Sequence, residues 1–535
     1  MSHPRQLKGK HRFFSTESSL LFLVFGIGFL IRCIAMANIH IINPDGVLYI
    51  YQAKAISSGQ WNLLNDCQLK FITIYPFLIA LFQVFVSKWV LSAQLVSFCF
   101  GFAMLIPLYL VLRQFFDCKI SQLTTLLFAL IPVFVRYSVD VMRDPVYWFF
   151  FTAAIWVFML HIHRDLKFKK SMGLLVISSF LMLLATLTRI EAIVLFPASC
   201  LFILLSYGDR KGYRLFGFLF PVIFLGGVAG LVAIKAGIDI LSLARLDDIS
   251  LKISAPFTSY HDLRDNVGAI ASMHRLTLLG EFLKNARSTI WLIALGTIFS
   301  NAMEAFFYPY VPFFVAGMGT AFKLLNRRSQ VLYPVLILIL SFFLLYAHVM
   351  QTWIMTYRFV ALLIIPSFVL AGLGIEKTIG VMTGNFKMSQ KKAISIVAVF
   401  IVIVGMAKSV KSIESDKTVY TQIGHRISRL TDENLPVGIA AKQSFVHQWV
   451  TFYANDQSSE PVCHGSFEID PQSIADLKSR MRSIGVVYFL WQESLWKNSP
   501  FGRKPSDFLN DFEELGRWHH DDPGNLVLFH LKSEG

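Results

Sequence analysis

An acid and an aromatic residue at helical spacing stand out near the start of the chain. In the stretch Asn43-Pro44-Asp45-Gly46-Val47-Leu48-Tyr49, Asp45 and Tyr49 fall on one face of a predicted helix that Gly59 is placed to end. A carboxylate with tyrosines beside it can serve as a general base that deprotonates a hydroxyl. The alternative is that Asp45 caps the helix by accepting hydrogen bonds from free backbone N–H groups.

A second acid, Asp144, stands in the stretch Val139-Asp140-Val141-Met142-Arg143-Asp144-Pro145. Asp144 would be the second catalytic acid, and Asp140 is a rival for the same role. The alternative is again a helix cap, with Pro145 at the first helical position and Arg143 as the partner of the carboxylate.

Charged residues that interrupt apolar runs form the third group. Arg189 and Glu191 separate two almost wholly apolar stretches, and a charge inside a membrane span costs about 2.5 to 3.5 kcal/mol on insertion scales. Arg189 either binds an anion or makes a structural contact with Glu191. Lys70 and the pair Tyr357-Arg358 offer further cations, for which the alternative is snorkelling to lipid headgroups.

The elements that carry these residues are membrane helices. The 535 residues are 55% hydrophobic and 16% charged, with a mean hydropathy of +0.56. Apolar stretches of roughly 17 to 25 residues recur from Leu20 to Ala407, and each can cross a hydrocarbon core about 30 Å thick. We therefore predict a polytopic α-helical membrane protein with about 11 transmembrane helices. This class excludes a soluble nucleic-acid binder, although the net charge is +15 and the pI is about 9.5.

The distribution of basic residues predicts which segments lie on each side of the membrane. Residues 1–17 are basic and expected in the cytoplasm, so the first span, about 18–38, leads outward. A transmembrane domain over 18–410 then carries external loops at 39–88 and 235–288. Phe71–Ser87 is expected to lie along the outer interface rather than to cross. Thr289–Ala302 is also apolar, and we do not count it as a crossing.

The last part of the chain, 411–535, differs in composition. It has 13 Lys+Arg against 17 Asp+Glu, a net charge of −4, whereas the preceding residues carry +19. Short apolar runs alternate there with helical patterns, which predicts a soluble extracytoplasmic α/β domain. Trp491, Trp496 and Trp518 are expected in its core rather than stacked on sugars. The six cysteines of the chain show no disulfide or metal framework, and no phosphate-binding loop of a nucleotide-driven pump is found.

The order of these motifs resembles the GT-C membrane glycosyltransferases. Asp45-Gly46 with Tyr49, Tyr75-Pro76-Phe77-Leu78, Arg143-Asp144-Pro145, Thr188-Arg189-Ile190-Glu191 and Tyr357-Arg358-Phe359 carry the resemblance. The chain is most similar to the branch that contains protein O-mannosyltransferases, the lipid A aminoarabinose transferase and bacterial lipopolysaccharide-core transferases. That family usually has two prolines where this chain has one at Pro76, and often Ser-Glu-Pro where this chain has Arg143-Asp144-Pro145.

The resemblance implies an activity and roles for the residues. A sugar would move from a polyprenyl-phosphate donor to a hydroxyl of an envelope lipid, glycan or protein, with inversion, on the non-cytoplasmic side of a bacterial inner membrane. Asp45 would be the base, and Arg189, Lys70 and Arg358 would stabilise the departing phosphate. Tyr49, Glu191 and Tyr357 would complete the substrate site. No cofactor is then needed; the alternative is that Asp45 and Asp144 hold Mg²⁺ or Mn²⁺.

Two other classes remain open. A transporter or flippase of lipid-linked saccharides would use the same cationic cavity without chemistry, although the sequence has no repeated halves of the kind many transporters carry. A membrane scaffold would use the tail to bind a partner. The enzymatic interpretation requires Asp45 to share a water-accessible vestibule with the cations on the non-cytoplasmic face.

Overall fold

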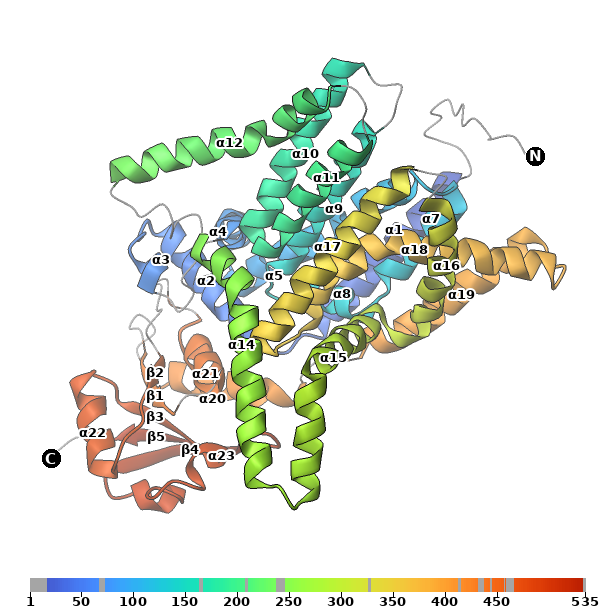
Figure 1. Cartoon of the computed structure of the whole chain (residues 1–535). Helices are drawn as coiled ribbons and strands as arrows, with labels where there is room; N and C mark the ends of the chain where they lie inside the picture. Colours follow the sequence, from blue (N-terminus) through green and yellow to red (C-terminus); the bar gives the residue numbers. More distant parts are fainter. Residues whose placement is uncertain are drawn as a thin grey trace. The chain divides into compact units, whose positions relative to one another are not determined.

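The fold is taken from a computed structural model of the whole chain (Figure 1). It describes residues 17–66, 73–162, 167–206, 210–236, 246–325, 329–411, 415–431, 437–442, 445–456, 458 and 466–532. Lys70, a predicted phosphate contact, lies outside the described residues. The chain forms two compact units, each of which is described by itself. We name them the helical unit (Met1–Cys33, Phe100–Arg136 and Asp144–Ser409) and the mixed unit (Ile34–Cys99, Tyr137–Arg143 and Val410–Gly535).

The helical unit consists almost entirely of helices. Its helices, some of which cross the unit boundary at one end, are α1 (Glu17–Ala37), α6 (Leu105–Leu112), α7 (Cys118–Ala129), α8 (Pro132–Tyr137), α9 (Asp144–His161), α10 (Phe168–Thr188), α11 (Leu195–Ser206), α12 (Lys211–Ala236), α14 (Leu246–Met273), α15 (Leu278–Phe306), α16 (Val311–Leu325), α17 (Ser329–Thr352), α18 (Tyr357–Gly384) and α19 (Gln390–Ser409). Short 3₁₀ turns, η1 (Ile190–Val194) and η2 (Tyr308–Tyr310), precede α11 and α16.

Eight helical segments among the described residues are long and apolar enough to cross a membrane. They are Ser19–Ala37, Trp89–Leu112, Phe168–Thr188, Lys211–Leu231, Leu278–Phe306, Gln330–Thr352, Tyr357–Gly384 and Gln390–Ser409. The predicted polytopic α-helical class is therefore confirmed. The span Leu278–Phe306 contains the apolar stretch that we did not count, so the number of crossings and the sidedness of later loops stay predictions.

Helix α18 is the central element of the helical unit, because 83% of its most apolar window is buried. It crosses α16 at two glycines. A Cβ atom on Gly317 would collide with the backbone carbonyl of Leu370, and one on Gly374 with that of Phe313. Small residues at this crossing let two membrane helices approach closely, which strengthens their packing where no hydrophobic effect operates.

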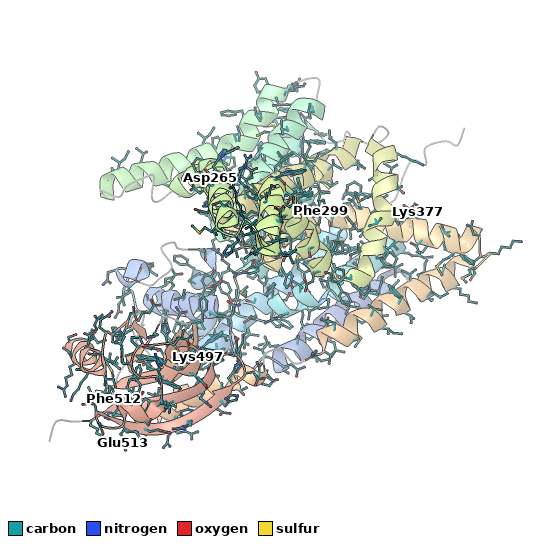
Figure 2. The ribbon with its side chains drawn as sticks, turned by 60° about the horizontal axis from the view of Figure 1, so that its bottom comes forward. Asp265, Phe299, Lys377, Lys497, Phe512 and Glu513 are labelled. Carbon is teal, nitrogen blue, oxygen red and sulfur yellow. The ribbon has the colours of Figure 1, made fainter. Side chains whose placement is uncertain are left out.

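The predicted insertion 235–288 is largely a helical hairpin. Figure 1 shows α14 and α15 running side by side, and Figure 2 labels Asp265 on α14 and Phe299 on α15. Thr277 begins α15 by accepting a hydrogen bond from the Gly280 N–H at 3.2 Å. Arg287 of α15 donates to the Arg264 carbonyl at 3.0 Å, which ties the two helices together.

The mixed unit combines the first predicted loop with the tail. Its helices are α2 (Pro44–Ser57), α3 (Leu63–Asp66), α4 (Ile74–Val86), most of α5 (Trp89–Ala103), α20 (Thr418–Ser428), α21 (Phe445–Ala454), α22 (Ile474–Ser483) and α23 (Glu493–Trp496). The 13 residues of α4 reach about 20 Å, too short to cross a membrane. Residues 34–99 belong to the same compact unit as the tail. The predicted boundary at 410, between a transmembrane domain and a separate tail domain, therefore stays a prediction.

The tail contains one five-stranded sheet in the order β2-β1-β3-β5-β4. Strands β2 (Ser466–Glu468), β1 (Ile439–Ala441) and β3 (Tyr488–Gln492) are parallel, whereas β5 (Gly524–Leu531) and β4 (Phe512–His520) extend it antiparallel. The predicted α/β tail is thus confirmed.

The central strands β1 and β3 are buried on both faces, whereas the edge strand β4 has an exposed face. Successive strand residues alternate between the two faces of a sheet, as at buried Phe512 and exposed Glu513, both labelled in Figure 2. Trp491 and Trp496 lie in the core, as expected, while Trp518 is only partly buried.

Candidate functional site

The first turn of α2 is held by Asn43, not by Asp45. The Asn43 side-chain oxygen accepts the Asp45 N–H at 3.0 Å, and Pro44 takes the first helical position. The interpretation of Asp45 as the cap is therefore wrong. The Asp45 carboxylate instead lies half-buried in the first turn, where a negative charge interacts favourably with the helix dipole.

Asp140, the rival second acid, positions this turn. Its buried Oδ1 accepts the Asn43 N–H at 3.1 Å and the Val141 N–H at 2.7 Å. Val141, the residue after Asp140, explains why a glycine follows Asp45. A Cβ on Gly46 would lie 2.8 Å from both the carbonyl oxygen and the Cβ of Val141. The segment around Asp140 thus fixes the start of α2, a role that the sequence did not indicate.

Tyr49 lies in an aromatic contact one turn beyond Asp45. Its buried ring meets Tyr75 edge-on at 5.3 Å, and the Arg143 guanidinium lies 5.9 Å from its centroid. The Tyr75 hydroxyl bonds to Ser97 Oγ at 2.8 Å, and Ser97 donates to the Met142 carbonyl at 2.9 Å. The Tyr75-Pro76 motif therefore supports the helix that carries Asp45.

Lys54, near the end of α2, binds the tail. Its ammonium donates to the Ser458 carbonyl at 2.8 Å and lies 3.5 Å from that of Asn455. Burial lowers the pKa of Lys54 to about 8, although nearby Asp456 raises it. Trp449 Nε1 adds a hydrogen bond to the Ile42 carbonyl at 2.9 Å. No local pattern singled out Lys54, because its partners are about 400 residues away.

In the helical unit, Arg189 binds two carboxylates at once. Its Nη1 donates to Asp144 Oδ1, and its Nε donates to Glu191 Oε2 at 3.3 Å. The guanidinium also lies 4.6 Å from the Phe359 ring centroid and 5.9 Å from that of Tyr147. We call these five residues the Arg189 cluster. The side chains of Arg189, Asp144 and Glu191 are only 4%, 1% and 11% exposed.

The chain places the cluster at helix ends. Asp144 is the first residue of α9, and Arg189 has extended backbone, with φ −143° and ψ 123°, where α10 ends and η1 begins. The capping interpretation of Asp144 named Arg143 as its partner, but the ion pair is with Arg189. The structural Arg189–Glu191 contact considered from the sequence is present.

Electrostatics keep Arg189 charged inside this apolar unit. Burial alone would lower the pKa of Arg189, but Asp144 and Glu191 raise it above its usual value. With two carboxylates around one guanidinium, its charge is already compensated. The prediction that Arg189 binds an anion is not tested by these contacts.

Two buried polar atoms of the cluster lack partners. Among the residues that the structure describes, nothing donates to Asp144 Oδ2 or bonds to the Tyr147 hydroxyl. Buried polar groups in native proteins nearly always have a partner, so these atoms offer an acceptor and a hydroxyl to a ligand or to water.

The start of α18 adds the remaining predicted residues. The Tyr357 hydroxyl donates to Glu304 Oε1 at 2.6 Å, and half-buried Arg358 precedes Phe359 of the cluster. His348 packs on the Phe359 ring at 4.4 Å. Glu304 and His348 are not among the residues predicted for the site, because each is a lone polar residue in the sequence.

The described residues bring no group of three or more His, Cys, Asp or Glu side chains together as metal ligands. Asp144 and Glu191 both bind the guanidinium, so the cation between their oxygens is Arg189. The alternative in which Asp45 and Asp144 hold Mg²⁺ or Mn²⁺ stays untested. Asp45 and Tyr49 lie in the mixed unit and the Arg189 cluster in the helical unit, so their shared vestibule also stays a prediction.

Comparisons with known proteins concern the family and the fold. Residues 73–235, which include Asp144, Arg189 and Glu191, match the family described as dolichyl-phosphate-mannose-protein mannosyltransferase. No curated protein sequence matches the chain.

Solved structures share the fold over nearly the whole chain. ArnT from Cupriavidus metallidurans bound to undecaprenyl phosphate has a TM-score of 0.59 at 10% identity, covering 96% of this chain and 98% of its own. The apo oligosaccharyltransferase of Archaeoglobus fulgidus also has a TM-score of 0.59, at 12% identity, covering 98% and 75%. Its complex with an inhibitory peptide and a dolichol-phosphate has a TM-score of 0.55 at 12% identity, covering 97% and 74%.

Proposed function

Because the chain has the GT-C fold of membrane glycosyltransferases, we propose that it transfers a sugar from a polyprenyl-phosphate donor to a hydroxyl acceptor. The acceptor is an envelope lipid, glycan or protein on the non-cytoplasmic side of a bacterial inner membrane. The observation that carries the proposal is the Arg189 cluster, a buried polar site with unused hydrogen-bonding atoms, inside the segment that matches the mannosyltransferase family.

The chemistry is a single displacement with inversion. The acceptor oxygen attacks the anomeric carbon while the bond from that carbon to the phosphate oxygen breaks, and the bonding electrons leave with the phosphate. Asp45 takes the proton of the acceptor hydroxyl. Its carboxylate is only half-buried, so an acceptor can approach it. Lys70, Arg358 and Arg189 stabilise the charge that develops on the phosphate.

An apolar cavity supports a lipid-linked donor. It has a volume of about 520 Å³ and is lined by side chains of α15, α16, α17 and α18, among which Ser367 is the one polar residue. An isoprenoid chain buries its surface favourably in such a cavity. The structures with undecaprenyl phosphate in ArnT and dolichol-phosphate in the oligosaccharyltransferase agree with a donor of this class.

A transfer assay separates this function from that of a flippase. The protein, purified in detergent, is given labelled mannosyl, glucosyl and aminoarabinosyl polyprenyl phosphates with an envelope extract as acceptor. We expect a labelled product of inverted anomeric configuration. If the protein moves lipid-linked sugar across sealed vesicles but forms no product in detergent, it is a flippase and the proposal is wrong.

Chelation tests the metal-independent form of the mechanism. Transfer is expected to continue in excess EDTA, because Lys70, Arg358 and Arg189 supply the positive charge. Loss of transfer in EDTA, with recovery on adding Mg²⁺ or Mn²⁺ but not Ca²⁺, would instead assign Asp45 and Asp144 as metal ligands.

A further inference from the structure

A cavity of about 1020 Å³ opens at one end of the sheet in the tail. Its lining includes Glu468, the last residue of β2, and Gln492, the last residue of β3. It also includes Phe445, Gln448 and Trp449 from α21, the helix that follows β1. The cavity therefore lies at the carboxyl ends of the three parallel strands.

The strand order makes this a binding position. The chain passes from β1 to β2 on one side of it and then to β3 on the other side. The segment that follows β1 leads to β2, whereas the segment that follows β3 leads to β4 on the other side of the sheet. Connections that leave adjacent strands in opposite directions open a crevice at such a switch point, and open α/β sheets bind ligands there. Topology and cavity thus point independently to the same site.

The apolar part of the lining is aromatic. Phe445 is 65% exposed and lines the cavity, so its ring is accessible to a ligand there. Trp449 and Tyr420 are buried and stack on each other with centroids 5.3 Å apart, so Phe445 is the aromatic ring of the lining that is open to a ligand. The C–H groups on one face of a sugar ring carry partial positive charge and pack well on the negative face of an aromatic ring.

The polar part of the lining suits hydroxyl groups. Gln448 and Gln492 are nearly buried amides, and Gln492 donates to Ser494 Oγ at 2.8 Å. Glu468 and Asp522 add carboxylates. Planar amides and carboxylates together both donate and accept, as vicinal hydroxyls require.

Charge argues against a phosphorylated ligand. The side chains of the lining that are charged at neutral pH are one lysine, Lys417, and the two carboxylates, so the formal charge is negative. The sequence after β1, Ala441-Lys442-Gln443-Ser444-Phe445, also lacks the glycines of a phosphate-binding loop. These observations exclude nucleotides and sugar phosphates as well-matched ligands.

We infer that this cavity is a saccharide-binding site that takes a neutral or amino sugar through Phe445 and the surrounding amides and carboxylates. The site goes beyond the proposed transfer, because binding here needs neither a donor lipid nor turnover.

The test is saturation-transfer difference NMR on the full chain in detergent. The probes are neutral hexoses, hexosamines and their disaccharides at millimolar concentration, with hexose phosphates as a charged comparison. We expect at least one neutral or amino sugar to bind, and Phe445→Ala to weaken that binding about 2- to 10-fold. Hexose phosphates should bind more weakly than the parent sugars.

Matched variants keep the test decisive. Phe386→Ala removes a phenylalanine that is 67% exposed but lies outside the cavity, and it should leave binding unchanged. Glu468→Gln should weaken hexosamine binding more than hexose binding. The inference is overturned if no sugar binds, if Phe445→Ala and Phe386→Ala bind sugar equally, or if only peptides or phosphates compete for the site. Because binding is read without turnover, an inactive transferase would not affect this result.

Discussion

The two acids that the sequence predicts as catalytic differ in their environments. Asp144 is 1% exposed, with Oδ1 bound to Arg189 and with Glu191 on the other side of the guanidinium. Asp45 is half-buried in the first turn of α2, which is positioned by hydrogen bonds between backbone and the side chains of Asn43 and Asp140. A carboxylate that neutralises a buried cation is needed for folding, whereas one at an accessible helix start is available to take a proton.

Asp45→Asn should have the largest effect. The amide keeps the size of the side chain but cannot accept the acceptor's proton, so we expect transfer to fall about 10²- to 10⁴-fold. The unfolding temperature in detergent should change little, because Asn43 remains the helix cap and only the interaction of the Asp45 charge with the helix dipole is lost. Turnover of the variant near the wild-type rate would show that Asp45 is not the base.

Asp144→Ala should mainly lower stability. Removing one partner of a buried ion pair leaves Arg189 poorly compensated, which costs about 3 kcal/mol in the free energy of unfolding. Glu191→Gln is the matched control and should cost less, because its contact is longer and its side chain is more exposed. Denaturant unfolding in detergent measures both variants. Equal stability of Asp144→Ala and wild type would mean that the Arg189 cluster does not hold the helices together.

Gly46→Ala tests how the Asp45 turn is positioned. The added Cβ meets the Val141 carbonyl and Cβ, so we expect a loss of about 1 to 3 kcal/mol and a decrease in transfer. Gly296→Ala places a Cβ where nothing lies within 4 Å and serves as the control. If both variants transfer sugar at the same rate, the close approach at Gly46 has no role in positioning Asp45.

The pH dependence of Lys54 should give the smallest effect. Its pKa is lowered from 10.5 to about 8 on folding, so between these values the unfolded chain binds more protons than the folded one. Stability of the mixed unit should therefore rise between pH 8 and pH 10.5, by less than about 1.4 kcal/mol per pH unit. Tryptophan fluorescence during denaturation at pH 7.5 and 9.5 measures this difference. Lys54→Met should reduce it, and an undiminished pH difference in that variant would contradict the assignment.

Local patterns predicted the elements better than their contacts. Runs of about 20 apolar residues identified the membrane helices, because a span must satisfy its own backbone over that length. The apolar stretch Thr289–Ala302 was not counted, and the structure extends it into the helical segment Leu278–Phe306, long and apolar enough to cross a membrane. Alternating short apolar runs identified the sheet of the tail.

Tertiary contacts were less accessible. Asp144, Arg189 and Glu191 were named singly, but the pairing of Asp144 with a residue 45 positions away depends on how α9 packs on α10. Asn43 and Asp45 are both capable caps, and Pro44 at the first helical position decided between them. The contacts of Lys54 and Asp140 could not be predicted locally, although Asp140 was named as a rival acid, because their partners come from distant segments.

The dependence of transfer on acceptor acidity tests the role of Asp45 most directly. The ratio of wild-type to Asp45→Asn rates is measured in single turnover with acceptor hydroxyls of decreasing pKa. If Asp45 is the general base, the ratio should fall steadily towards one, because an acidic hydroxyl needs less help to lose its proton. A ratio that is the same for every acceptor would contradict the account and assign Asp45 to binding or positioning.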